Sequence, residues 1–147
     1  MTTMTAQATQ MYQVFIKATP EQIWDAITKP EFTEKYFYGS RAKVTRESYL
    51  SVDGEGHDLV KGTVFEHDPP TRLVHGWRAL YDPETAAEDE SRVTWEIEAQ
   101  DGGYSKLTVV HDRLEGAPKT ATSVAGGWPY VLSGLKTLLE TGAPLAG

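Results

Sequence analysis

The sequence predicts one α+β domain in which a curved antiparallel sheet wraps around a long C-terminal helix. Three observations support this fold class. A first strand-like segment is followed by two short helix-like segments, and the middle of the chain contains segments in which apolar and polar residues alternate. The C-terminal segment has apolar residues at three- and four-residue steps, as in an amphipathic helix. A one-faced sheet and such a helix bury their apolar surfaces against each other.

The N-terminal part of the chain predicts a strand and two short helices. Residues 11–17 alternate imperfectly and form the predicted strand. Thr19 suits the N-cap of a helix, and Gln22 stands where the partner in a capping box is expected. This helix should end near Lys29, because the residue before a proline disfavours the helical conformation. A second short helix is predicted over residues 30–36.

The middle of the chain is predicted to form antiparallel strands. The alternation is clearest in residues 92–99. Turn sequences at residues 53–56 (DGEG) and 101–103 (DGG) separate neighbouring strands. The acidic segment 82–91 is expected to be a solvated loop. The predicted strands cover residues 40–50, 59–67, 72–80, 92–99 and 104–112.

The C-terminal segment predicts one long amphipathic helix. Gly142 followed by Pro144 is typical of a helix end. Pro129, which follows two glycines, does not fit the interior of a regular helix. We therefore expect the helix either to kink at this proline or to become regular only near Trp128. The apolar stripe comprises Val124, Trp128, Val131, Leu132, Leu135, Leu138 and Leu139.

Composition argues against several classes of protein. The net charge of −7 argues against nucleic-acid binding, because phosphate binding needs a basic face. The chain has no cysteine, which excludes a disulfide framework and fits a cytoplasmic protein. No apolar run reaches the roughly 18 residues of a membrane span. We expect a frayed tail at residues 1–10, one domain at 11–142 and a short tail at 143–147.

The sequence predicts neither a metal site nor a cofactor. The four histidines form no helical pair four residues apart and no cluster with the spacing of metal ligands. A phosphate-binding glycine loop, a dinucleotide fingerprint and a nucleophile elbow do not occur. No motif therefore requires an enzyme.

Four segments resemble a known superfamily. They are residues 18–28 (ATPEQIWDAIT), 68–78 (DPPTRLVHGWR), 92–96 (RVTWE) and 126–142 (GGWPYVLSGLKTLLETG). In their order and spacing they look like the START/Bet v-like superfamily (SRPBCC). Within it they are most similar to homologues of the activator of the heat-shock protein 90 ATPase. The resemblance covers residues 10–142 approximately and implies a helix-grip fold.

The resemblance also bears on function. Members of the superfamily include lipid and steroid binders, polyketide cyclases and proteins with no assigned ligand. The chain departs from its subfamily at residues 44–48, where a strand with two glycines is usual, and at Tyr36 and Phe37, which replace a second tryptophan. Both departures concern the expected rim of a pocket between sheet and helix.

Aromatic residues are the main candidates for a pocket wall. Trp77 and Trp95 should face inward on neighbouring strands, and Trp128 should face them from the helix. They are interpreted either as the wall of a ligand cavity or as ordinary core packing. Tyr36 and Phe37 either cover the entrance or pack at a helix end. The candidate ligand-binding residues are Tyr36, Phe37, Val64, His75, Trp77, Trp95, Val109, His111, Trp128, Val131, Leu132 and Leu135.

Three residues are candidates for proton transfer if the protein is an enzyme. His75 and His111 share faces with apolar residues, so each is either a polar anchor, an acid–base group or a half-buried histidine with satisfied hydrogen bonds. Glu66 points into the cavity if Val64 faces inward. The opposite register places His67 inside instead, and a shift of one residue exchanges the two.

Three functions are compatible with these features. The first hypothesis is a non-catalytic protein that binds a small apolar or amphipathic molecule between the sheet and the C-terminal helix. The second is an enzyme similar to polyketide cyclases or dehydratases. The third is a stress-response or co-chaperone-like interaction module with a chaperone partner. A homodimer formed through an edge strand or the convex sheet face is a further hypothesis.

Overall fold

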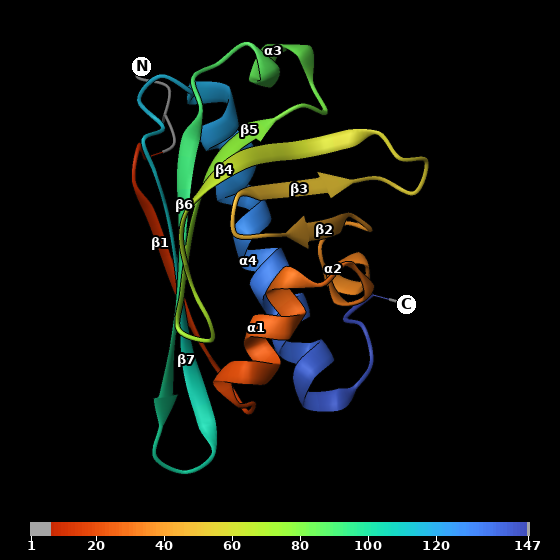
Figure 1. Cartoon of the computed structure of the whole chain (residues 1–147), viewed down its shortest axis with the longest axis vertical. Coiled ribbons are helices and arrows are strands. Elements are labelled where there is room, and N and C mark those ends of the chain that lie inside the picture. The colour runs from red at the N-terminus through yellow and green to blue at the C-terminus, as the bar shows by residue number, and fades with distance from the viewer. Residues whose placement is uncertain (1–6, 147) are drawn as a thin grey trace, which may run out of the picture.

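The computed structural model describes residues 7–146 and contains one seven-stranded antiparallel sheet with helices packed on its concave side (Figure 1). The strand order is β1-β7-β6-β5-β4-β3-β2. In Figure 1 the strands β1, β6 and β7 run steeply whereas β2 and β3 lie across the view, so the sheet is strongly twisted. The strands are β1 (Gln10–Ile16), β2 (Arg41–Val44), β3 (Ser48–Val52), β4 (Asp58–Asp68), β5 (Arg72–Ala79), β6 (Ser91–Gln100) and β7 (Tyr104–Asp112).

The helices confirm the predicted α+β helix-grip architecture. They are α1 (Pro20–Thr28), α2 (Pro30–Tyr36), the single turn α3 (Pro83–Ala86) and α4 (Pro118–Thr141). The predicted capping box is present at the start of α1: the Thr19 hydroxyl accepts a hydrogen bond from the Gln22 backbone N–H at 3.2 Å, and the Gln22 side chain accepts one from the Thr19 backbone N–H at 2.8 Å.

The long helix α4 lies against the concave face of the sheet, and the core fills the space between them. It runs without interruption through Pro129, so the expectation that it becomes regular only near Trp128 is wrong. It ends as predicted at Gly142, whose φ of 79° is left-handed and whose N–H donates to the Leu138 carbonyl at 2.8 Å. Leu135 on its inner face is fully buried.

Residues 40–50, predicted as one strand, instead form two strands. The turn between β2 and β3 is held by Thr45, whose hydroxyl accepts hydrogen bonds from the backbone N–H groups of Glu47 and Ser48 at 3.2 and 3.0 Å. A threonine side chain that replaces a backbone partner in this way makes a tight turn without glycine or proline. The turn therefore carries no strong sequence signal.

Strand β4 contains an irregularity that decides the orientation of its side chains. Val64 pairs with His75, whereas Glu66 pairs with the preceding residue of β5, Val74, so Phe65 is an extra residue in a β-bulge. Val64 faces the core side and His67 is half-buried, while Glu66 is exposed. Each of the two predicted registers is thus right for one half of the strand.

Candidate functional site

An apolar cavity lies between the sheet and the middle of α4. Its volume is about 450 Å³, within the usual range for small-molecule sites of roughly 300–1,000 Å³. Its walls come from strands β3, β4 and β5, from the segment after α2 and from α4. We call it the central pocket. It is lined by Phe37, Tyr38, Ser40, Ser51, Leu59, Val60, Trp77, Tyr81, Ser123, Val124, Gly126, Gly127, Trp128 and Val131.

Three aromatic rings form one wall of the central pocket. Phe37 stacks against Trp77 with ring centroids 6.3 Å apart and meets Trp128 edge-on at 5.8 Å. The rings of Trp77 and Trp128 lie 5.7 Å apart. Such offset and edge-to-face contacts stabilise aromatic clusters beyond simple burial. The wall is therefore a closely packed apolar surface made of rings at different inclinations.

The rim of the pocket carries uncharged hydroxyl groups. The Tyr81 hydroxyl lies 2.9 Å from the Ser123 hydroxyl and so links the segment after β5 to α4. Tyr38 stacks on Tyr130 at 5.1 Å. Burial raises the pKa of Tyr38, and the neighbouring phenols of Tyr130 and Tyr81 raise it further, so its hydroxyl keeps its proton at neutral pH. These groups can donate and accept hydrogen bonds but add no charge.

Two adjacent glycines of α4 are among the lining residues of the pocket. A Cβ atom added to Gly126 would meet no atom within 4 Å. One added to Gly127 would touch only the Tyr38 ring, at 3.8 Å from its hydroxyl oxygen. A side chain on Gly127 would therefore extend beside Tyr38 at the pocket, whereas one on the exposed Gly126 would enter open space. Gly134, two turns further along α4, differs, because a Cβ there would lie 3.1 Å from Tyr36.

His111 lies behind the aromatic wall and holds it in place. Its Nδ1 accepts a hydrogen bond from the indole N–H of Trp128 at 3.1 Å. Its Nε2 lies 2.7 Å from the Ser91 hydroxyl, which lies 3.1 Å from the Trp77 carbonyl oxygen. A neutral ring protonated at Nε2 satisfies all three contacts: Nε2 donates to Ser91, and Ser91 donates to Trp77. His111 thus fixes the orientation of a pocket tryptophan.

His75 makes a matching arrangement with the opposite tautomer. Its Nδ1 lies 2.8 Å from the Gly76 carbonyl oxygen and must donate to it. Its Nε2 accepts from the indole N–H of Trp95 at 3.0 Å. The ring also stacks on Tyr49 at 4.0 Å with an interplanar angle of 3°. Both ring nitrogens are therefore used within the fold.

Burial keeps both histidines neutral. Burial lowers the pKa of His75 to about 4, although its bond to Gly76 opposes this shift. Burial, together with the nearby His75, lowers the pKa of His111 to about 3. Neither side chain is exposed. A general acid or base needs a pKa near the working pH and a free nitrogen, and in this conformation neither histidine has either.

The indole N–H of Trp77 differs from those of Trp95 and Trp128. It is buried and has no hydrogen-bond acceptor among the described residues. The Nδ1 atom of His67, which lies against Trp24 with ring centroids 5.3 Å apart, is likewise buried without a partner in the described part of the chain. An unpaired buried donor costs about 1–3 kcal/mol, so Trp77 is the least satisfied member of the pocket wall.

Only some of the candidate ligand-binding residues line the central pocket. Four of them do: Phe37, Trp77, Trp128 and Val131. Two others have defined roles behind it, because Trp95 orients His75 and Tyr36 donates to the Ala26 carbonyl oxygen at 2.7 Å. The remaining candidates pack in the core or against it and do not line the pocket: Val64, His75, Val109, His111, Leu132 and Leu135.

Glu66 lies away from the pocket. The β-bulge turns it to the outer face of the sheet, where its carboxylate pairs with Arg72 at 2.5 Å. Arg72 also contacts Glu96 on the next strand at 2.5 Å. The interpretation of Glu66 as a group inside the cavity is therefore corrected by the bulge at Phe65.

Sequence reasoning missed several lining residues. Ser40 and Ser51 are buried at the pocket surface, while Tyr81 and Ser123 form its rim. Single serines and a tyrosine in a loop form no sequence pattern that predicts a ligand site. The adjacent glycines of α4 were the available signal, because glycine inside a helix costs about 1 kcal/mol and needs a reason.

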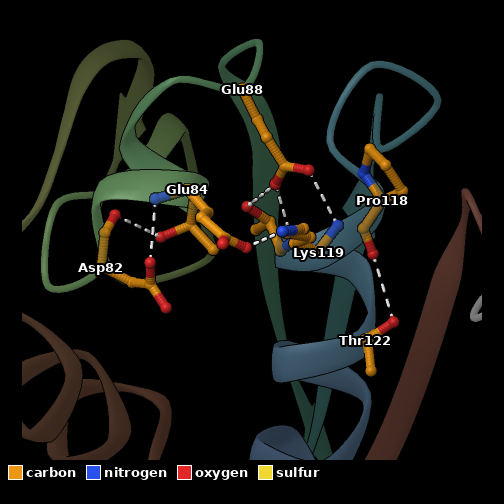
Figure 2. A network of polar contacts seen from close by, with 8 residues as sticks. Asp82, Glu84, Glu88, Pro118, Lys119 and Thr122 are labelled. Carbon is orange, nitrogen blue, oxygen red and sulfur yellow. Dashed lines mark hydrogen bonds and ion pairs between the residues drawn. The ribbon is translucent and has the colours of Figure 1, made fainter.

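The acidic segment 82–91 is anchored to α4 and is not a freely solvated loop (Figure 2). Glu88 accepts hydrogen bonds from the backbone N–H groups of Lys119 and Thr120, each at 2.8 Å, and from the Thr120 hydroxyl at 2.8 Å. These bonds cap the helix, whose own N-cap residue, Ala117, offers no side chain for the purpose. Burial raises the pKa of Glu88, but the bonds from Lys119 and Thr120 outweigh this and lower it.

Two classes of site are not found in the described residues. No group of three or more potential metal-binding side chains comes together within residues 7–146. Within the same range, no helix combines the length and apolar character needed to cross a membrane.

Comparison with known proteins places this architecture in a family. The family model described as "Activator of Hsp90 ATPase homolog 1-like protein" matches residues 17–140. The chain belongs to this family. The match confirms the predicted relationship to homologues of the heat-shock protein 90 ATPase activator. No curated protein matches the chain.

Solved structures share the fold at low sequence identity. Protein MLL2253 from Mesorhizobium loti has a TM-score of 0.72 and 21% identity, with 90% of this chain and 96% of that chain covered. The HSP90 activator PFC0360w from Plasmodium falciparum has a TM-score of 0.70 and 19% identity, with 91% and 97% covered. The Aha1 dimer from Colwellia psychrerythraea has a TM-score of 0.71 and 15% identity, with 92% and 98% covered. At these identities the likeness establishes the fold alone.

Proposed function

We propose that this protein binds a small, largely apolar molecule in the central pocket and performs no chemistry on it. The observation that carries the proposal is the pocket itself. Its aromatic wall of Phe37, Trp77 and Trp128 lies next to Gly127 of α4, which has no side chain to fill the neighbouring space. A small-molecule site is typically such an apolar concavity with a few placed polar groups.

The hydrogen bonding of the histidines supports a binding role over a catalytic one. Both nitrogens of His75 and both nitrogens of His111 are engaged within the protein. Neither residue lines the pocket. A substrate would have to break the bond between Trp128 and His111 before that histidine could transfer a proton.

The chaperone and dimer hypotheses stay predictions. The family description and the name of the Plasmodium relative suggest activation of a chaperone ATPase. A pull-down with a purified Hsp90-type chaperone tests this, and the absence of any complex would count against it. The Colwellia relative is described as a dimer, and sedimentation of this chain at several concentrations tests the same assembly here.

The binding proposal can be tested with a fluorescent apolar probe. N-phenyl-1-naphthylamine is uncharged, aromatic and brightens in apolar surroundings. We expect saturable binding to the wild type. Gly127→Leu should abolish it, because its Cβ would lie 3.8 Å from the Tyr38 hydroxyl oxygen at the pocket and the rest of the side chain would take up the adjoining space.

Two matched variants complete this test. Gly127→Ala removes the glycine without filling the pocket and should retain most of the binding. Ser133→Leu adds the same side chain at an exposed position of α4 outside the pocket and should bind as the wild type does. Circular dichroism checks that each variant is folded. Equal binding by folded Gly127→Leu protein would refute the proposed site.

A further inference from the structure

The central pocket offers no partner for a charged ligand. Among the lining residues in the described part of the chain, none is acidic, basic or a histidine. The polar side-chain groups of the lining residues are hydroxyls, including those of the buried Ser40 and Ser51, and the indole N–H groups of Trp77 and Trp128, all of them uncharged. A charge moved from water into such a site without an opposite charge loses solvation that hydroxyls alone do not replace.

The protein around the mouth of the pocket is negatively charged. Tyr81, at the rim, leads directly into an acidic segment, which Glu88 fastens to the first turn of α4. That first turn lies one turn before Ser123, the rim residue of the helix. The field near the mouth therefore repels anions. The acidic residues are Asp82, Glu84, Glu88, Asp89 and Glu90.

Two positive side chains that contact this acidic segment are already engaged with it. The Lys119 ammonium pairs with Glu84 (Figure 2). The Arg78 guanidinium donates to the backbone carbonyl oxygens of Ala86, at 3.1 Å, and Glu88. The backbone N–H groups at the start of α4, which form a natural anion site in many proteins, are occupied by the Glu88 carboxylate. An anionic ligand would have to displace these contacts.

The rim instead suits an uncharged polar group. The Tyr81 and Ser123 hydroxyls are 2.9 Å apart, and the Tyr38 hydroxyl lies above the backbone of Gly127. Hydroxyls can donate to a carbonyl or ether oxygen and accept from a hydroxyl. The aromatic wall below them offers flat surfaces for a planar ring system.

We propose that the central pocket selects an uncharged ligand with a planar ring system and a polar end that contacts the Tyr81–Ser123 rim, and that it rejects anions such as fatty acids or carboxylated aromatics. This inference rests on the proposed binding function and specifies the class of ligand. It follows from the uncharged lining, the acidic surroundings of the mouth and the occupied helix N-terminus.

Two probes with the same ring skeleton test separately whether the pocket binds an apolar ligand and whether it rejects an anion. N-phenyl-1-naphthylamine and 8-anilinonaphthalene-1-sulfonate differ by the sulfonate. We expect the uncharged probe to bind at least tenfold more tightly, which corresponds to about 1.4 kcal/mol. Raising the ionic strength should reduce the difference in affinity between the two probes, because salt screens the repulsion between the acidic segment and the sulfonate.

One variant should change the preference. Ser123→Lys places an ammonium group at the rim and should increase the affinity for the sulfonate probe about tenfold. Ser123→Met, a control of similar length without charge, should not increase it. Both variants lose the bond to Tyr81, so this loss does not distinguish them.

The outcomes are distinct. If the wild type binds both probes equally, selection against anions is refuted while the proposed pocket stands. If it binds neither probe, the proposed function fails, and the inference with it. If Ser123→Lys and Ser123→Met bind the sulfonate probe equally, the missing charge is not the cause of the preference, which also refutes the inference.

Discussion

The hydrogen bonds between tryptophans and histidines predict an ordered effect of three substitutions. Trp77, Trp95 and Trp128 are all buried, with exposed fractions of 4%, 1% and 2%. The indole N–H groups of Trp95 and Trp128 donate to His75 and His111, whereas that of Trp77 has no acceptor among the described residues. Replacing each by phenylalanine removes a similar part of a ring and one N–H group.

The magnitudes follow from this difference. Each replacement should cost roughly 1–2 kcal/mol of unfolding free energy through lost packing. Trp95→Phe and Trp128→Phe also leave a buried histidine nitrogen without its donor, which costs a further 1–3 kcal/mol or so. Trp77→Phe instead removes a donor that was unpaired. We therefore expect Trp77→Phe to be the least destabilising by about 1–3 kcal/mol.

Urea denaturation followed by far-ultraviolet circular dichroism measures this order, because it does not depend on tryptophan fluorescence. The dependence of the free energy on urea should be unchanged, which shows that the midpoints report stability. A loss for Trp77→Phe equal to or larger than that for the other two would refute the role assigned to the indole–histidine bonds.

Three further predictions concern α4 and the buried histidines. Gly126→Ala should stabilise the protein by about 0.5–1 kcal/mol because it enters open space, whereas Gly134→Ala, with a neighbour at 3.1 Å, should not; equal thermal denaturation shifts would contradict this. Glu88→Ala should cost about 1–2 kcal/mol in urea denaturation by uncapping the helix, and an unchanged midpoint would exclude the cap. The pKa values of His75 and His111, about 4 and about 3, lie below the ordinary 6.5, so the unfolded chain takes up protons first as pH falls. The free energy of unfolding should be highest above pH 6.5 and fall by roughly 5 kcal/mol as the pH is lowered to 4.5. A free energy of unfolding that does not change between these pH values would contradict the assignment of both rings as buried and neutral.

Local signals in the sequence were enough for much of the fold. The capping box at Thr19 and the stripe that includes Leu135 involve residues three or four positions apart, so the chain itself contains both partners. The start of α4 has no such signal, because its cap is Glu88, about thirty residues earlier in the chain. An acidic run looks like a solvated loop until its partner is known.

The register of β4 shows a different limit. The alternation of apolar and polar residues assumes an uninterrupted strand, but the bulge at Phe65 changes the face of every later residue. Glu66 and His67 exchange sides as a result. The residues next to Phe65 include no glycine or proline that would mark the bulge. The bulge arises from the pairing with β5, in which Val74 and His75 are neighbours while their partners on β4 are two residues apart.

The two histidines show why a catalytic role predicted from the sequence can differ from the role seen in the structure. A histidine on an apolar face has the residue type of a catalyst, and only the position of its neighbours decides its role. Here each ring accepts from a tryptophan and donates to an oxygen, so the pair holds Trp95 and Trp128 in fixed orientations. Buried polar groups that are fully satisfied favour one arrangement of a core over its alternatives. The arrangement is therefore sensitive to acid, because protonation removes the acceptor that each indole needs, and the aromatic wall of the central pocket depends on the bond between Trp128 and His111.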